Sequence, residues 1–178
     1  MALAAVRDGL AHHHWLGRWR AIQVLRDTVP QNDDHAVQEL VRLTADGTPE
    51  VRVAAAEALR TVAVRGDARV ERVLTKLCVD EFECVRAAAV AGIEKLGSAR
   101  CEKTSQLLVR MLGDPSADVR QGAVHALEKL SDVGDEAATQ GLTQILVHCE
   151  ESRRIKQHAL LRYSVYLIYQ YNSANADT

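Results

Sequence analysis

The sequence predicts an all-α solenoid, a stack of helical hairpins, and three observations lead to this fold class. An arginine recurs every 34 residues, an apolar residue recurs seven positions after each arginine, and glycine- or proline-containing turns separate the apolar stretches. The arginines are Arg18, Arg52, Arg86, Arg120 and Arg154, and the apolar residues are Leu25, Leu59, Ile93, Leu127 and Leu161. A fixed period of this length predicts about five hairpins that bury their apolar faces only by stacking on one another.

Composition agrees with a helical chain and argues against several classes of function. The 178 residues are 47% hydrophobic and only 4% aromatic, with three prolines. A formal charge of −2 provides no bulk attraction to nucleic acid. The four cysteines form no Cys-x-x-Cys pair, so we expect free thiols and neither a metal nor a cofactor. No apolar run reaches the roughly 18 residues of a membrane span. We expect an intracellular, cytoplasmic protein, with an organellar location left open.

Helix boundaries follow from caps and breakers along the chain. We expect the first hairpin over residues 2–11 and 15–28 and the second over about 34–45 and 48–65. Thr48 is the expected cap of the helix that Pro49 begins. A third and a fourth hairpin repeat the pattern, and a fifth ends in a long final helix from about Ser152 to Tyr171. We expect a single domain over residues 1–171 and a disordered polar tail over residues 172–178.

Three turns between helices share a sequence in which an aspartate precedes a Val-Arg pair. The residues are Asp46 with Arg52, Asp80 with Arg86, and Asp114 with Arg120. The pattern resembles a HEAT repeat, most of all the short kind also found in bilin-lyase-related proteins, over about residues 15–165. The resemblance implies a right-handed solenoid in which these side chains form a structural ladder. Each arginine could reach an aspartate in its own turn or in the adjoining one.

The outer repeats depart from this pattern. In the first repeat, Gly17 replaces valine and His12 stands where aspartate is expected. In the last, His148 and Arg153 replace aspartate and valine. We therefore expect these two repeats to be degenerate.

Enzymatic readings of the resemblance find little support in the residues. HEAT-like hydroxylases of the hypusine pathway hold two irons with His-Glu dipeptides, and this sequence contains none. HEAT-like DNA glycosylases use a basic surface, whereas the second helices here carry charges of both signs. A bilin lyase or isomerase-type accessory protein remains the alternative, although no positional motif supports it. We predict no catalytic residue and no enzyme.

By resemblance, second helices line the concave side, and we expect a protein partner to bind there. The candidate contacts are Trp19, Glu57, Ala91 and His125. Trp19 shares a helix face with Trp15, and the pair could cap the solenoid, fill its core or anchor a partner. His125 could be a solvated side chain or a ligand contact.

The predicted final helix is apolar almost all round, although a terminal helix should be polar on its outer face. It carries all four tyrosines of the chain. We expect Tyr163, Tyr166, Leu167 and Tyr169 to contribute to a contact surface, with self-association as one use. The sequence thus predicts a non-catalytic protein–protein interaction scaffold or assembly subunit.

Overall fold

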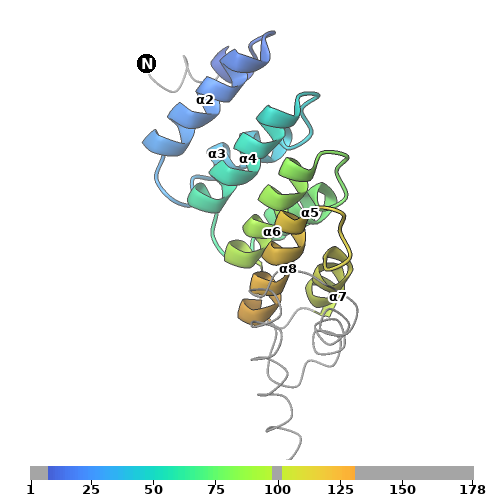
Figure 1. Cartoon of the computed structure of the whole chain (residues 1–178). Helices are drawn as coiled ribbons and strands as arrows, with labels where there is room; N and C mark the ends of the chain where they lie inside the picture. The colour runs from blue at the N-terminus through green and yellow to red at the C-terminus, as the bar shows by residue number, and fades with distance from the viewer. Residues whose placement is uncertain (1–7, 98–101, 131–178) are drawn as a thin grey trace, which may run out of the picture. The chain divides into compact units, whose positions relative to one another are not determined.

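A computed structural model describes residues 8–97 and 102–130, and within them every regular element is a helix (Figure 1). The chain divides into two compact units, one within residues 1–97 and the other within residues 98–178. Each unit is described by itself. The single domain over residues 1–171 stays a prediction, and the tail over 172–178 lies outside the described residues.

The predicted all-α fold of stacked hairpins is confirmed. The first unit contains α2 (Trp15–Thr28), then α3 (Asp34–Leu43) with α4 (Pro49–Val62), then α5 (Ala68–Leu77) with α6 (Glu83–Leu96). The second unit contains the hairpin of α7 (Glu102–Met111) and α8 (Ala117–Leu130). The first helix of each complete hairpin has 10 residues and the second has 14.

The helices of the first unit form two layers (Figure 1). Helices α2, α4 and α6 follow one another in one layer, and each packs on the next. Small residues make this contact close, because α4 buries four alanines, Ala54, Ala55, Ala56 and Ala58. Gly92 serves the same purpose between α5 and α6, since a Cβ there would lie 2.8 Å from Cδ2 of Leu74. The core of this unit therefore runs between the layers and along the second helices.

Backbone hydrogen bonds join successive repeats at the loops that follow the second helices. The Asn32 N–H donates to the carbonyl of Val62 at 2.7 Å, and the Gly66 N–H donates to the carbonyl of Leu96 at 2.9 Å. Asn32 and Gly66 are 34 positions apart and both have positive φ, 67° and 82°. Glycine and asparagine tolerate this left-handed backbone better than other residues. The turn therefore repeats together with the helices.

The two departures in the first repeat compensate for each other. A Cβ on Gly17 would lie 2.6 Å from Cγ of His12, so the imidazole occupies the space that valine would need. Nδ1 of His12 accepts the N–H of His14 at 3.1 Å. Oδ1 of Asp46, the equivalent residue of the next repeat, accepts the N–H of Thr48 at 2.9 Å. His12 thus keeps the aspartate's hydrogen bond, and Gly17 makes room for the larger ring.

We predict that Gly17→Val lowers the free energy of unfolding by about 1–3 kcal/mol, because it overpacks the space that His12 fills. The double variant with His12→Asp restores the residues of the inner repeats and should recover most of that loss. Urea unfolding of both variants measures the effect. Equal destabilisation of the single and double variants would contradict the compensation.

Candidate functional site

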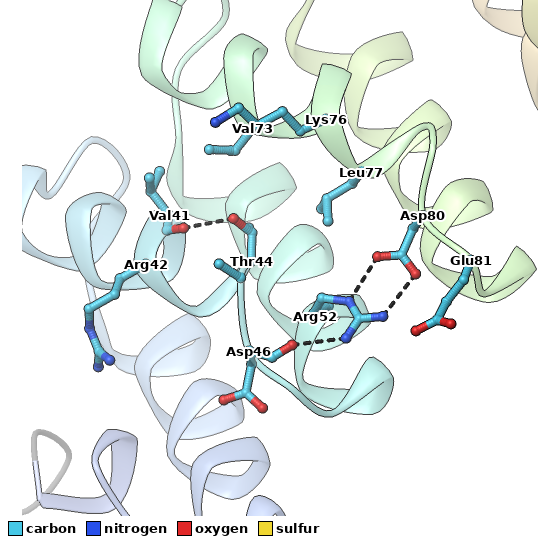
Figure 2. A pocket seen from close by; sticks show the side chains of 11 residues that line it. Val41, Arg42, Thr44, Asp46, Arg52, Val73, Lys76, Leu77, Asp80 and Glu81 are labelled. Carbon is cyan, nitrogen blue, oxygen red and sulfur yellow. Dashed lines mark hydrogen bonds and ion pairs between the residues drawn. The ribbon is translucent and has the colours of Figure 1, made fainter.

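Bidentate Arg–Asp pairs connect successive turns of the first unit. Nε and Nη2 of Arg52 donate to the two carboxylate oxygens of Asp80 at 2.9 and 2.8 Å. Nη1 of the same arginine donates to the Asp46 carbonyl at 2.8 Å (Figure 2). One guanidinium therefore holds its own turn through a carbonyl and the adjoining turn through a carboxylate. Both alternatives left open by the sequence are present, each with a different acceptor.

Arg18 makes the same connection one repeat earlier. Its Nε and Nη2 donate to the carboxylate of Asp46 at 2.7 and 2.8 Å, and its Nη1 donates to the His12 carbonyl at 2.8 Å. Arg18 is not among the predicted ladder residues, because His12 replaces the aspartate of its own turn. The arginine needs only the carbonyl there, which any residue provides. The 34-residue spacing of Arg18 was the signal that could have found it.

Arg86 and Arg120, the other two predicted ladder arginines, donate to backbone carbonyls of their own turns. Nη1 of Arg86 donates to the carbonyls of Asp80 and Glu81 at 2.9 and 3.1 Å. Arg120 does the same with the carbonyls of Asp114 and Pro115. The second unit therefore repeats the local geometry of the first.

The ladder aspartates also accept a backbone N–H immediately before each second helix. Asp80 accepts the N–H of Phe82 at 3.0 Å, and Asp114 accepts the N–H of Ser116 at 2.8 Å, as Asp46 does with Thr48. Thr48 lies at the predicted N-cap of α4, but its hydroxyl makes no capping hydrogen bond. That hydroxyl instead accepts from Nη2 of Arg18 at 3.4 Å. The expected cap from the Thr48 side chain is therefore absent, and Asp46 instead accepts the backbone N–H of Thr48 itself.

Removing Arg52 should be costly, because its side chain and that of Asp80 are only 10% and 12% exposed. We predict that Arg52→Ala lowers the free energy of unfolding by about 3 kcal/mol, since it leaves a buried carboxylate without its partner. The matched control is Arg42→Ala, whose ion pair with Glu39 lies at the surface and should contribute under about 1 kcal/mol. Urea unfolding of the two variants tests the difference, and equal losses would contradict it.

Ion pairing sets the acid response of the ladder. Burial by itself would raise the pKa of Asp80, but the hydrogen bonds from Arg52 and from the Phe82 N–H outweigh it and lower that pKa below its ordinary value. The pKa of Asp46 is lowered in the same way, with Arg18 and Thr48 as donors opposing the effect of burial. A carboxyl whose pKa is lower in the folded state stabilises the fold above its unfolded pKa of about 3.9. That contribution disappears as the pH falls through the folded pKa.

We predict that the urea midpoint of the wild type stays level from neutral pH to about pH 4 and falls below it. Asp80→Asn should be less stable at neutral pH and should show a shallower fall, because one of the responsible carboxyl groups is gone. Midpoints measured across this pH range for both proteins test the prediction. Parallel curves would exclude Asp80 as a source of the acid sensitivity.

A groove of about 750 Å³ lies between the ends of α3 and α5, next to the ladder (Figure 2). Val41, Val73 and Leu77 supply apolar lining, and Arg42 and Lys76 supply cations.

Within the described residues, no group of three His, Cys, Asp or Glu side chains could hold a metal ion. None of the helices in that part of the chain is long and apolar enough to cross a membrane.

The predicted binding face on the second helices carries side chains with partial exposure. Trp15 and Trp19 are 39% and 36% exposed, so neither is buried in the core. Glu57 is exposed on α4, and Ala91 is half-buried on α6. His125 on α8 is half-buried, and its Nε2 atom is buried. Tyr163, Tyr166, Leu167 and Tyr169 lie outside the described residues.

Comparison with known families identifies the repeat. The family described as HEAT repeats matches residues 3–94 and again residues 71–161. The chain belongs to the HEAT-repeat family. The curated proteins contain no sequence that matches it.

Solved structures of similar fold agree with this HEAT-repeat assignment. A designed armadillo repeat protein in complex with the peptide (KR)4 is 21% identical, with a TM-score of 0.66 over 90% of this chain and 80% of that chain. A second computationally designed armadillo repeat protein for modular peptide recognition is 20% identical, with a TM-score of 0.65 over 92% and 82%. An engineered protein is 19% identical, with a TM-score of 0.71 over 93% and 78%. These similarities show the fold.

Proposed function

We propose that this HEAT-repeat chain is a non-catalytic scaffold that binds an extended segment of a partner protein across its second helices. The binding face in the first unit consists of the outward residues of α2, α4 and α6, and Trp19, Glu57 and Ala91 are among them. His125 occupies the position on α8 that is equivalent to Ala91, and it is a separate candidate contact within the second unit. The C-terminal helix with Tyr163, Tyr166, Leu167 and Tyr169 is the second predicted contact surface, and an intracellular location stays a prediction.

The packing of the layers is the observation that carries this proposal. Helix α4 contacts both α2 and α6 extensively, whereas α3 and α5 touch at few places. When a two-layer stack curves, its helices approach most closely on the inside of the curve. Closer packing of the second helices therefore supports a concave surface formed by them. A concave surface excludes water from a bound chain and gives it contacts from several repeats at once.

The residues on this face suit an extended chain. Trp19 supplies a large amphipathic ring at one end, of the kind that dominates many interfaces. Ala87 and Ala91 on α6 are small and half-buried, so a partner backbone can approach the helix closely. Gln23 and Glu57 add polar side chains that can bond to a peptide backbone. The designed armadillo repeat protein of similar fold is in complex with the peptide (KR)4, which supports a peptide segment as the partner.

Ala91→Arg should abolish partner binding while leaving the melting temperature unchanged, because a long cation would fill the space over α6 without disturbing the core. The matched control is Thr75→Arg, which adds the same side chain to an exposed site on α5 in the other layer. Affinity purification of the three tagged proteins, followed by mass spectrometry, compares their partners. Recovery of the same proteins by wild type and Ala91→Arg would contradict a binding role for this face.

A further inference from the structure

The turn between α5 and α6 differs in chemistry from the other turns of the ladder. Val79 and Phe82 are 73% and 42% exposed there, and Phe82 is the one phenylalanine of the chain. The equivalent residues are Ala45 and Thr48 in the α3–α4 turn, and Gly113 and Ser116 in the α7–α8 turn. Two small or polar positions of the repeat are thus occupied by exposed apolar side chains in this turn alone among the three.

Phe82 is unfavourable for the helix that it precedes. It lies at the N-cap of α6, where serine and threonine are preferred, and makes no side-chain capping bond. The Arg52 guanidinium lies 5.6 Å from the centre of the Phe82 ring, within reach of a cation–π contact. The Arg–Asp pair does not require that contact, because Arg18 and Asp46 pair in the same geometry beside Thr48. The fold therefore offers little reason for a phenylalanine at this position.

Two carboxylates accompany the apolar pair. Glu81 and Glu83 flank Phe82 in sequence, and both are exposed. The equivalent positions carry Gly47 and Pro49 in the α3–α4 turn, and Pro115 and Ala117 in the α7–α8 turn. Asp80 is already paired with Arg52, so Glu81 and Glu83 make the outer surface of the turn acidic. Lys76 in the neighbouring groove extends away from Glu81 (Figure 2).

We propose that Val79, Glu81, Phe82 and Glu83, which we call the α5–α6 turn surface, dock a segment of a partner protein that carries a basic side chain next to an apolar one. The exposed valine and phenylalanine would gain burial against the apolar side chain. The two glutamates would pair with the basic side chain, and this charge complementarity selects a basic segment over an acidic one. This surface lies at the turns and is separate from the face on the second helices.

The test uses a phage-displayed library of random peptides, selected on the full chain and counter-selected on the double variant Val79→Ala, Phe82→Thr. These substitutions introduce the residues of the α3–α4 turn. We expect the enriched peptides to combine lysine or arginine with an aromatic or aliphatic residue. A synthetic, fluorescein-labelled copy of the most enriched peptide is then titrated by fluorescence anisotropy. Its Kd should rise at least tenfold for Phe82→Thr, for Val79→Ala and for the pair Glu81→Gln, Glu83→Gln.

Controls separate docking from folding and from other occupants. Val64→Ala removes an exposed valine at the end of α4 and should leave the Kd unchanged, as should Ala91→Arg on the second-helix face. The melting temperature of Phe82→Thr should equal or exceed that of the wild type, since threonine can cap α6. Val79→Ala provides an independent variant, because a side chain so exposed contributes little to the fold.

Several results would overturn the proposal. Enrichment of acidic peptides, or of none over the counter-selection, would exclude a basic and apolar segment. An unchanged Kd together with a lower melting temperature in Phe82→Thr would make the phenylalanine a structural residue held by Arg52. Sedimentation that shows a dimer lost in Val79→Ala would assign the surface to a second copy of the chain. Slow alkylation of the adjacent Cys84 in the wild type would show that the chain itself covers the turn.

Discussion

The guanidinium of a ladder arginine joins three pieces of chain, and the stacking of the first unit depends on it. Arg52 binds a carbonyl of its own turn and both carboxylate oxygens of Asp80. Asp80 in turn accepts the N–H of Phe82, the N-cap residue of α6. The arginine therefore orients the next hairpin as well as its own. A planar fork suits this task, because it fixes two hydrogen bonds in direction and distance. A lysine would provide charge without that geometry.

Two sets of contacts at the ends of the hairpins leave the sides of the stack available for binding. The Arg–Asp pairs join the inner turn of one hairpin to the inner turn of the next hairpin. The backbone hydrogen bonds of Asn32 and Gly66 join the loop after one hairpin to the end of the next hairpin. Both link positions 28 to 30 residues apart, so each described repeat of the first unit is joined to the next one in that unit at two places. The outward side chains of α2, α4 and α6 take no part in these links. They can differ from repeat to repeat without loss of the fold, which is the property that a binding scaffold needs.

Departures from the repeat are informative because the equivalent turns serve as internal controls. The pair His12 and Gly17 has a structural explanation, since each makes the other possible. Val79 and Phe82 have no structural explanation of comparable strength. Exposed apolar side chains and an apolar N-cap residue are both unfavourable for the fold. Comparison of equivalent positions therefore distinguishes two kinds of departure. His12 and Gly17 are accommodated by packing within the chain, whereas Val79 and Phe82 would be explained by contact with a partner.

The sequence by itself determined the fold class and the period, because stacking imposes the same requirement on every repeat. It indicated the ladder residues of the inner repeats but not Arg18. It also predicted the start of α4 at Pro49. Only the tertiary structure decided which acceptor each arginine takes, since Asp46 and Asp80 are equally compatible with the spacing around Arg52. Likewise, the contact of His12 with Gly17 and the exposure of Phe82 depend on how side chains meet in space. Periodicity records what the repeats share, whereas these contacts arise where one repeat differs from the next.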